Sequence, residues 1–270
     1  MRRHLLIAAP MLAATLLAGT AVLAAQDGTP MPPKSTAPFD KRGFDGTWDR
    51  YPLPTDTQRD PTTVPIPRAA DIPPPPLKPQ YVPAWEATRK KAQEAAARGE
   101  PIANDYTACR PDGMPTMMQA MFPMEVVTNK RQMTIIQEAY NQVRRIYFNE
   151  TLPKPEDAEP GFWGHSAGRW EGDTLVVDTV GIKDYVMFRD VPHSANMRIN
   201  ERMKMLDANH FENVVTVTDP EYLEKPWTWR WIYQRRPNYK MYEYVCEENH
   251  EFADPETGAQ RMRIVPPPNK

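Results

Sequence analysis

The chain lacks the motifs that identify several common classes of enzyme. It contains no Gly-x-Ser-x-Gly elbow, no phosphate loop and no dinucleotide fingerprint, which argues against nucleotide and hydride chemistry. Histidine and cysteine pairs at metal-ligand spacing are also missing. A zinc site would need His165, His193 and a carboxylate to converge in space, so the sequence predicts no metal and no cofactor.

The chain also lacks a dense block of charge. Its 33 Lys and Arg residues oppose 35 Asp and Glu residues, for a formal net charge of −2. Without Arg2 and Arg3 the net charge would be about −4, and a weakly acidic protein of this kind is a poor match for polyanions. We therefore expect neither nucleic acid nor an anionic membrane surface as a partner.

Cysteine is scarce, with Cys109 and Cys246 as the two residues of this type. In an oxidising compartment we expect one disulfide between them, which would tie the start of the folded region to its last strand. The alternative is two separate buried thiols.

Residues 1–25 have the pattern of an export signal. Arg2 and Arg3 precede an apolar run over residues 5–23, and small residues near Ala24 offer a cleavage site. The alternative is an uncleaved membrane anchor, which Pro10 and the many alanines disfavour. We expect a periplasmic or secreted protein with no stable membrane insertion after cleavage.

Proline is concentrated before the main body of the chain, with 15 of the 31 prolines in residues 26–83. This composition predicts an extended arm, partly polyproline II. Two interpretations of Gly46-Thr47-Trp48 within this stretch are open. These residues begin a first strand in which Trp48 packs on the core, or Trp48 is a single aromatic contact that holds an otherwise loose arm. Residues 84–98 are strong helix formers followed by Gly99, which predicts a surface helix.

From residue 124 onward, alternation of apolar and polar residues predicts a series of short strands. The expected strands cover residues 124–128, 133–140, 143–148, 165–170, 174–180, 195–207, 211–218, 227–233 and 239–246. Gly172 supplies the turn of a hairpin over residues 165–180. Because such a series must protect its edges, the sequence predicts a mainly β fold: an antiparallel up-and-down barrel, lipocalin-like, or a two-sheet sandwich. The β domain would span residues 84–250, with a polar tail over 251–270.

Three motifs point to a family. They are GHSAGRWEGDTLVVDTVG at residues 164–181, YVCEEN at residues 244–249 and CRPDGMP at residues 109–115. Together they resemble a widespread family of uncharacterised exported bacterial proteins, over roughly residues 84–250. The resemblance implies that the two cysteine motifs pair, and it implies no activity. The comparison with lipocalins is a weaker analogy of fold.

Glu201 stands in the middle of an apolar stripe. By alternation it shares a strand face with Met197, Ile199, Met203 and Met205. If that face points into the barrel, the enclosed carboxylate suits general acid or base chemistry. Its burial requires a partner, and Arg145 or Arg230 from another strand could reach it. The alternative is a structural Glu–Arg pair.

Three further residues are candidates for acid–base chemistry. Asp178 interrupts an apolar strand, and His165 and His193 lie at boundaries between loops and strands, where a polar site at a barrel mouth would be built. Each histidine could instead cap a turn.

Two groups of large side chains are candidates for binding. Trp227, Trp229, Trp231 and Tyr233 share one face, and such a ladder can stack on a planar ligand or form a packing wall. Met114, Met117, Met118, Met121 and Phe122 are clustered in sequence, and pliable side chains of this kind line an apolar site or fill a core.

Three functions fit this sequence, in the following order. The first is binding of a small apolar or aromatic molecule in the barrel, by Trp227, Trp229, Trp231, Met203, Met205, Arg145 and Arg230. The second is a cofactor-free lyase, isomerase or hydrolase with Glu201 and His193 as acid and base. The third is an envelope interaction module that uses the proline-rich arm and the tryptophan ladder.

Overall fold

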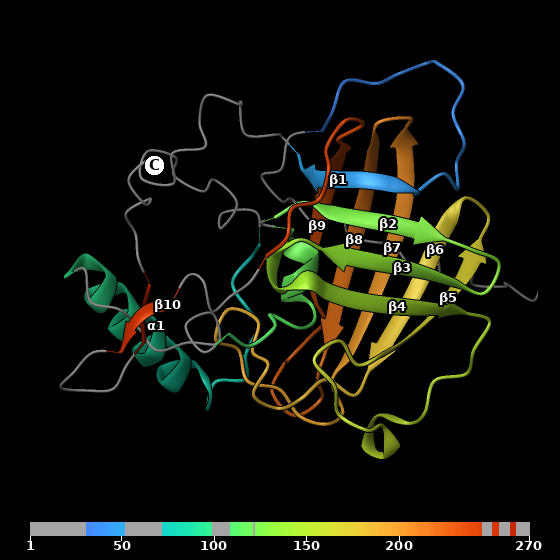
Figure 1. Ribbon diagram of the computed structural model, residues 1–270. Coiled ribbons are helices and arrows are strands. Elements are labelled where there is room, and N and C mark those ends of the chain that lie inside the picture. Colours follow the sequence, from blue (N-terminus) through green and yellow to red (C-terminus); the bar gives the residue numbers. More distant parts are fainter. Residues whose placement is uncertain are drawn as a thin grey trace, which may run out of the picture.

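A closed β-barrel forms the body of the protein in the computed structural model (Figure 1). The structure describes residues 31–51, 72–98, 109–120, 122–244, 250–253 and 260–262. In these ranges nine strands close the barrel, and β10 and β11 pair as a separate two-stranded sheet. The mainly β fold and the barrel are confirmed, and closure of the sheet rules out the two-sheet sandwich.

The barrel strands follow one another in sequence order around the wall. They are β1 (Gly46–Arg50), β2 (Met124–Thr128), β3 (Gln132–Gln137), β4 (Gln142–Phe148), β5 (His165–Glu171), β6 (Thr174–Val180), β7 (Arg198–Asp207), β8 (His210–Thr218) and β9 (Trp227–Arg235). The barrel closes because β1 pairs with both β2 and β9. No edge of the main sheet is left open, as the alternating pattern requires.

One pairing departs from the predicted antiparallel series. β4 and β5 are parallel, with Ile146 opposite Ser166. The chain between them crosses over through the short 3-10 helix η5 (Pro155–Asp157) instead of turning back as a hairpin, as a parallel pair requires. The strictly up-and-down topology is therefore wrong at this one position.

The first strand comes from the proline-rich stretch. Trp48 on β1 is fully buried, and it contacts Phe211 edge-to-face at a centroid distance of 4.7 Å. The first of the two interpretations of Gly46-Thr47-Trp48 is therefore confirmed. In contrast, residues 239–244 of the expected last strand form no strand, so β9 ends the barrel.

Side chains fill the barrel interior. A short 3-10 helix, η3 (Thr116–Gln119), brings the buried Met117 and Met118 against the strands. The Tyr233 hydroxyl donates to the Met118 carbonyl at 2.5 Å, and the Gln137 amide donates to the Met117 carbonyl at 3.2 Å. These methionines fill the core, which is one of the two roles predicted for the cluster. Met121 lies outside the described residues.

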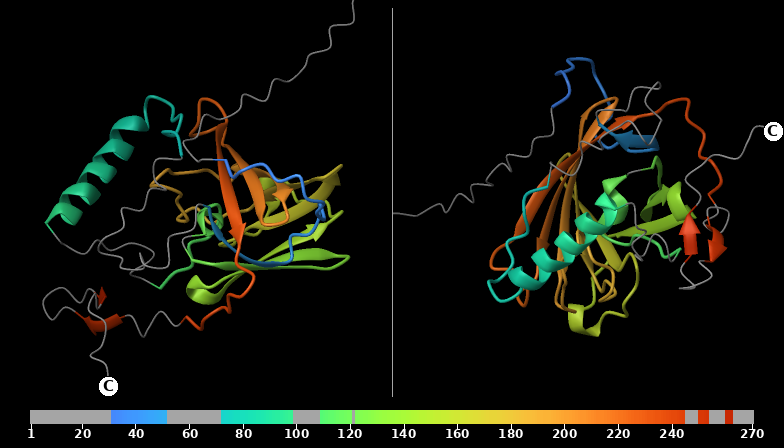
Figure 2. Two further views of the ribbon diagram at one scale, coloured as in Figure 1. Left: turned by 90° about the horizontal axis from the view of Figure 1, so that it is seen from above. Right: turned by 90° about the vertical axis from the view of Figure 1, so that its left-hand side faces the viewer.

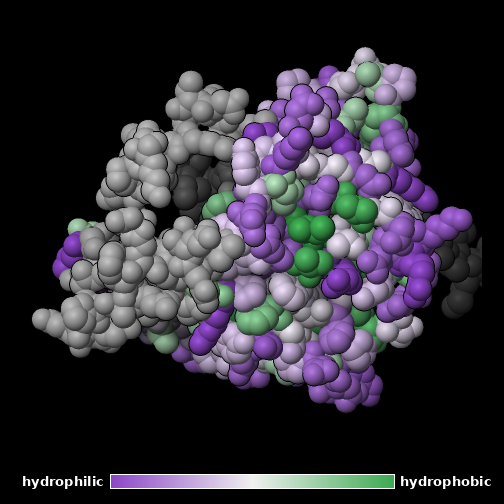
Figure 3. All heavy atoms as spheres, viewed as in Figure 1, coloured by the Kyte–Doolittle hydropathy of each residue, from purple (hydrophilic) through white to green (hydrophobic). Residues whose placement is uncertain are grey.

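The predicted helix is present as α1 (Val82–Ala97) and lies outside the barrel wall (Figure 2). Trp85 is its large anchor, and the indole Nε1 donates to the Arg189 carbonyl at 3.0 Å. The barrel surface over β1–β4 is mostly hydrophilic, with a small group of apolar residues at its centre (Figure 3). The two strands of the small sheet, β10 (His250–Ala253) and β11 (Gln260–Met262), were not predicted.

Candidate functional site

The tryptophan ladder lies inside the barrel. Trp227, Trp229 and Trp231 are 3%, 0% and 0% exposed, because alternation along β9 turns all three side chains inward and Thr228 and Arg230 outward. We call these three residues the tryptophan cage. Their inward position contradicts the part of the interaction-module hypothesis in which the ladder meets another protein.

A phenylalanine from a loop occupies the tryptophan cage. The ring of Phe188 stacks on Trp229 at a centroid distance of 4.9 Å and an interplanar angle of 24°. It also contacts Trp227 at 5.4 Å and meets Trp231 edge-on at 6.1 Å. Each aromatic pair of this kind contributes about 0.5–1.5 kcal/mol beyond burial. Phe188 is therefore held as a planar aromatic ligand would be held.

A tight turn presents Phe188 to the cage. Residues 182–192, which we call the mouth loop, connect β6 to the chain that leads into β7. Phe188 and Val191 form an isolated antiparallel bridge, and Arg189 and Asp190 between them have φ values of 55° and 62°. Two consecutive non-glycine residues in this left-handed region are uncommon and indicate a strained turn.

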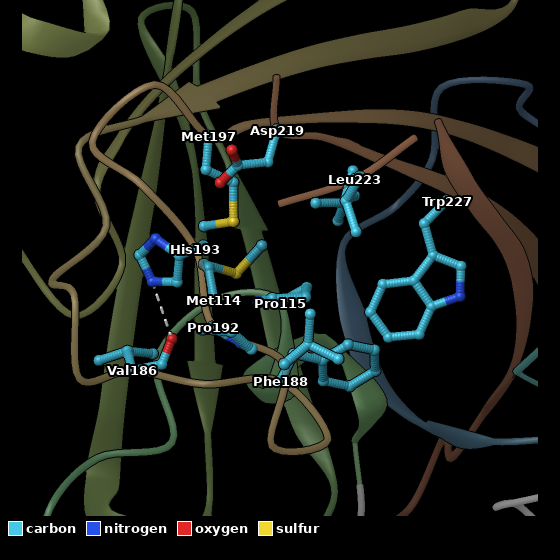
Figure 4. Close-up of a pocket in the computed structure, with 12 residues that line it drawn as sticks. Met114, Pro115, Val186, Phe188, Pro192, His193, Met197, Asp219, Leu223 and Trp227 are labelled. Carbon is cyan, nitrogen blue, oxygen red and sulfur yellow. Dashed lines mark hydrogen bonds between the residues drawn. The ribbon is translucent and has the colours of Figure 1, made fainter. Parts of the chain in front are cut away.

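His193 fastens the mouth loop to the barrel end. Its Nε2 lies 3.1 Å from the carbonyl oxygens of both Lys183 and Val186, and Figure 4 shows the ring turned toward Val186. Because a carbonyl oxygen can only accept, the Nε2–H of His193 donates to this pair. Ser194 extends the connection, since its backbone N–H donates to Asp219 at 2.6 Å and its hydroxyl donates to the same carboxylate at 3.0 Å.

The recess beside Phe188 is small. It is lined by Met114, Pro115, Val186, Phe188, Val191, Pro192, His193, Met197, Val217, Asp219, Leu223 and Trp227 (Figure 4). Its volume is about 20 Å³, which is room for about one water molecule. Ligand pockets measure about 300–1,000 Å³, so a ligand reaches the tryptophan cage only if the mouth loop and Phe188 move.

Five strands each contribute one inward polar side chain to a second group of interior residues. We call Arg144, Ser166, Thr179, Glu201 and Asn213 the inner polar cluster. An Arg144 guanidinium N–H donates to the Glu201 carboxylate, and Arg144 also donates to Ser166 at 3.2 Å and to Thr179 at 3.1 Å. The Asn213 amide donates to the other Glu201 oxygen at 2.8 Å. Glu201 is 0% exposed, so its predicted inward position is confirmed.

The predicted partners of Glu201 were wrong. Arg144 forms the ion pair, because β4 turns Arg144 and Ile146 inward and leaves Arg145 exposed. Arg230 is half-buried on the outward side of β9. Neither Arg145 nor Arg230 lies on the interior face that carries Glu201. Met203 and Met205, in contrast, are 0% and 3% exposed and face the interior as predicted.

The four candidate acid–base residues lie in different places. Asp178 faces outward on β6, where it accepts from Arg169 and Asn200 at 2.6 Å each. His165 is exposed at the start of β5, with Nε2 2.9 Å from the Glu159 carbonyl. His193 lies at the barrel mouth, whereas Glu201 is enclosed and paired. The structure therefore brings no two of them together as an acid–base pair.

Cys109 carries no free thiol. Its predicted partner, Cys246, lies outside the described residues, as does the predicted export signal, so both the bridge and export stay predictions. Within the described ranges, no helix has the length and apolar character needed to cross a membrane, and no three His, Cys, Asp or Glu side chains are grouped to hold a metal.

Comparison with family models, curated proteins and solved structures found no match. The functional interpretation of the site therefore depends on its geometry alone.

Sequence reasoning missed several residues of this site, and Phe188, Arg144 and Asn213 show why. Phe188 stands in a loop without periodicity, so nothing in the pattern indicated that it enters the cage. To predict Arg144, one must know which face of β4 points inward. To predict Asn213, one must know the register of β8 against β7, in which Asn213 lies opposite Met203. An inward phase for β4 could have been inferred from Ile146, which alternates with Arg144.

Proposed function

We propose that this protein is an exported β-barrel protein that binds a small aromatic or apolar molecule, which replaces the ring of Phe188 in the tryptophan cage. The observation that carries the proposal is the seating of Phe188 against all three indole rings. A side chain supplied by a loop can leave such a position without breaking the barrel wall. The N-terminal pattern and the family resemblance support export.

Displacement of Phe188 lowers the apparent affinity for a ligand. The free protein must open the mouth loop before a ligand can enter, and the apparent dissociation constant rises in inverse proportion to the open fraction. The hydrogen bonds of His193 to Lys183 and Val186 help to hold the closed state. We therefore expect measurable but weak binding by the natural chain and tighter binding when Phe188 is truncated.

The test compares the natural chain with Phe188→Ala. A library of small aromatic molecules is screened by thermal shift and ligand-observed NMR. We expect at least one compound to raise the melting temperature of the natural chain. We expect Phe188→Ala to bind that compound about tenfold more tightly, because the ligand no longer competes with the Phe188 ring for the cage.

Phe211→Ala is the matched control. Phe211 is also fully buried in the barrel and stacks on Tyr233 at 4.4 Å, but it lies on β8 and not on a loop. Its truncation creates a cavity without opening the mouth. The proposal fails if no compound binds the natural chain and Phe188→Ala binds no better than Phe211→Ala.

A further inference from the structure

The interior next to the tryptophan cage holds four polar atoms that have no hydrogen-bond partner among the described residues. They are Arg144 Nη1, Asn213 Oδ1, Trp229 Nε1 and Trp231 Nε1. All four residues are at most 1% exposed. Buried polar atoms in folded proteins are nearly always hydrogen-bonded, so this group of four points to a bonding partner other than the described residues.

The four residues form one continuous group. Arg144 and Asn213 both donate to Glu201. Asn213 lies opposite Trp231 in the pairing of β8 with β9, and the rings of Trp231 and Trp229 are 5.4 Å apart. Phe188 contacts both indoles. Two of the four atoms therefore belong to indoles that contact the Phe188 ring, and the other two belong to residues that connect Trp231 with Glu201.

The types of these atoms limit the chemistry of the partner. The Asn213 Nδ2 group donates to the Glu201 carboxylate, so the amide orientation is set and Oδ1 is the free acceptor. The remaining three atoms are N–H donors. A hydroxyl group can satisfy three of these four atoms, because it donates one hydrogen bond and accepts two. A carboxylate offers Asn213 no donor and adds a negative charge beside Glu201, and a hydrocarbon bonds to none of the four.

We propose that the ligand is a phenol-type molecule, with its ring in the tryptophan cage and its hydroxyl group bonded to Asn213 Oδ1, Arg144 Nη1 and an indole N–H. This inference rests on the proposed function and specifies its ligand class. A neutral hydroxyl also leaves the buried Arg144–Glu201 pair balanced, since it brings no charge of its own into the low-dielectric interior.

The experiment measures dissociation constants of phenol, toluene and benzoate by ligand-observed NMR in sealed tubes, for the natural chain and for Phe188→Ala. Toluene has the stronger hydrophobic drive, so a purely apolar cavity prefers it over phenol. We expect phenol to bind at least fivefold more tightly than toluene and benzoate. Trp231→Phe should weaken phenol binding about fivefold through the lost N–H donor and leave toluene within twofold.

Trp170→Phe is the control for the indole substitution, because Trp170 is half-buried at the outer end of β5. It should change neither affinity. Toluene or benzoate binding as tightly as phenol would overturn the inference while leaving the proposed function standing. Equal weakening of phenol and toluene by Trp231→Phe would overturn it as well. Absence of binding by all three probes to both chains would remove the inference and count against the proposed function too.

Discussion

Glu201 and Arg144 form an ion pair without access to water, since both side chains are 0% exposed. Removing one partner of a buried pair leaves an uncompensated charge, which typically costs about 3–5 kcal/mol. We expect Glu201→Gln to lower the free energy of unfolding by about this amount. The double variant Arg144→Met/Glu201→Leu should cost less than Glu201→Gln, because no buried charge is left. Urea unfolding followed by tryptophan fluorescence measures both.

Asp178→Asn is the control for this prediction. Asp178 also pairs with an arginine, Arg169, but these side chains are 39% and 52% exposed, and exposed pairs contribute at most about 1 kcal/mol. If Glu201→Gln proves as mild as Asp178→Asn, the buried pair is not the structural centre of the barrel.

Tyr233 gives the barrel a predicted sensitivity to alkaline pH. Burial raises the pKa of Tyr233, and the nearby Glu201 raises it further, while Arg50 lowers it. Folding therefore favours the neutral phenol. This contribution to stability is complete below the pKa of an unfolded tyrosine, about 10, and it is lost as the pH rises above that value toward the raised pKa of the folded protein.

In Tyr233→Phe, the free energy of unfolding should fall less steeply above pH about 10. Near neutral pH, the same substitution should lower the free energy of unfolding by about 1 kcal/mol, because the hydrogen bond to Met118 is lost. Tyr242→Phe is the control, because Tyr242 is 66% exposed. Urea unfolding at a series of pH values from 8 to about 11 tests this. Parallel curves for the two variants would contradict it.

At the scale of elements, the β5–β6 hairpin shows how backbone conformation and space act together. Gly164, just before β5, has a φ of +61°, and a Cβ there would lie 2.4 Å from the Val180 carbonyl oxygen and 2.7 Å from Ile182. Gly172 in the turn has a φ of +63°, but a Cβ added there would have no atom within 4 Å. Both positions require the left-handed region, and only Gly164 is also confined.

Gly172→Ala should therefore cost about 1–2 kcal/mol through φ alone. Gly164→Ala should cost about 1–3 kcal/mol more, because the added methyl overlaps atoms that cannot move freely. Thermal unfolding of the two variants gives the comparison. Equal melting temperatures would show that the backbone around Gly164 gives way more easily than the packing indicates.

Most individual strands could be predicted from alternation. β2 and β6 have the predicted bounds, and β7 begins three residues later than predicted. The phase of β4 was harder, because Arg144 and Arg145 are adjacent and identical, and the main local indication that Arg144 faces inward is Ile146, which lies on the same strand face. The parallel pairing of β4 with β5 depends on a crossover, whose path the local pattern does not specify.

At the scale of the whole molecule, the predicted bridge between Cys109 and Cys246 would connect the chain before η3 to the chain after β9. We expect the exported protein to show one disulfide by mass measurement under non-reducing conditions, with the mature chain beginning near residue 25. Reduction should lower the free energy of unfolding by about 2–4 kcal/mol. Two free thiols in the exported protein would contradict the bridge.

The sequence by itself determined the mainly β class, most strand positions, the helix at α1 and the inward position of Glu201, because each of these follows from local propensity and from the two-residue period of a strand. Only the tertiary structure decided which arginine meets Glu201, that Trp48 closes the barrel, and that Phe188 occupies the tryptophan cage. These contacts join residues far apart in the chain, and their selection depends on strand register, loop path and competition for interior volume, none of which a local pattern contains.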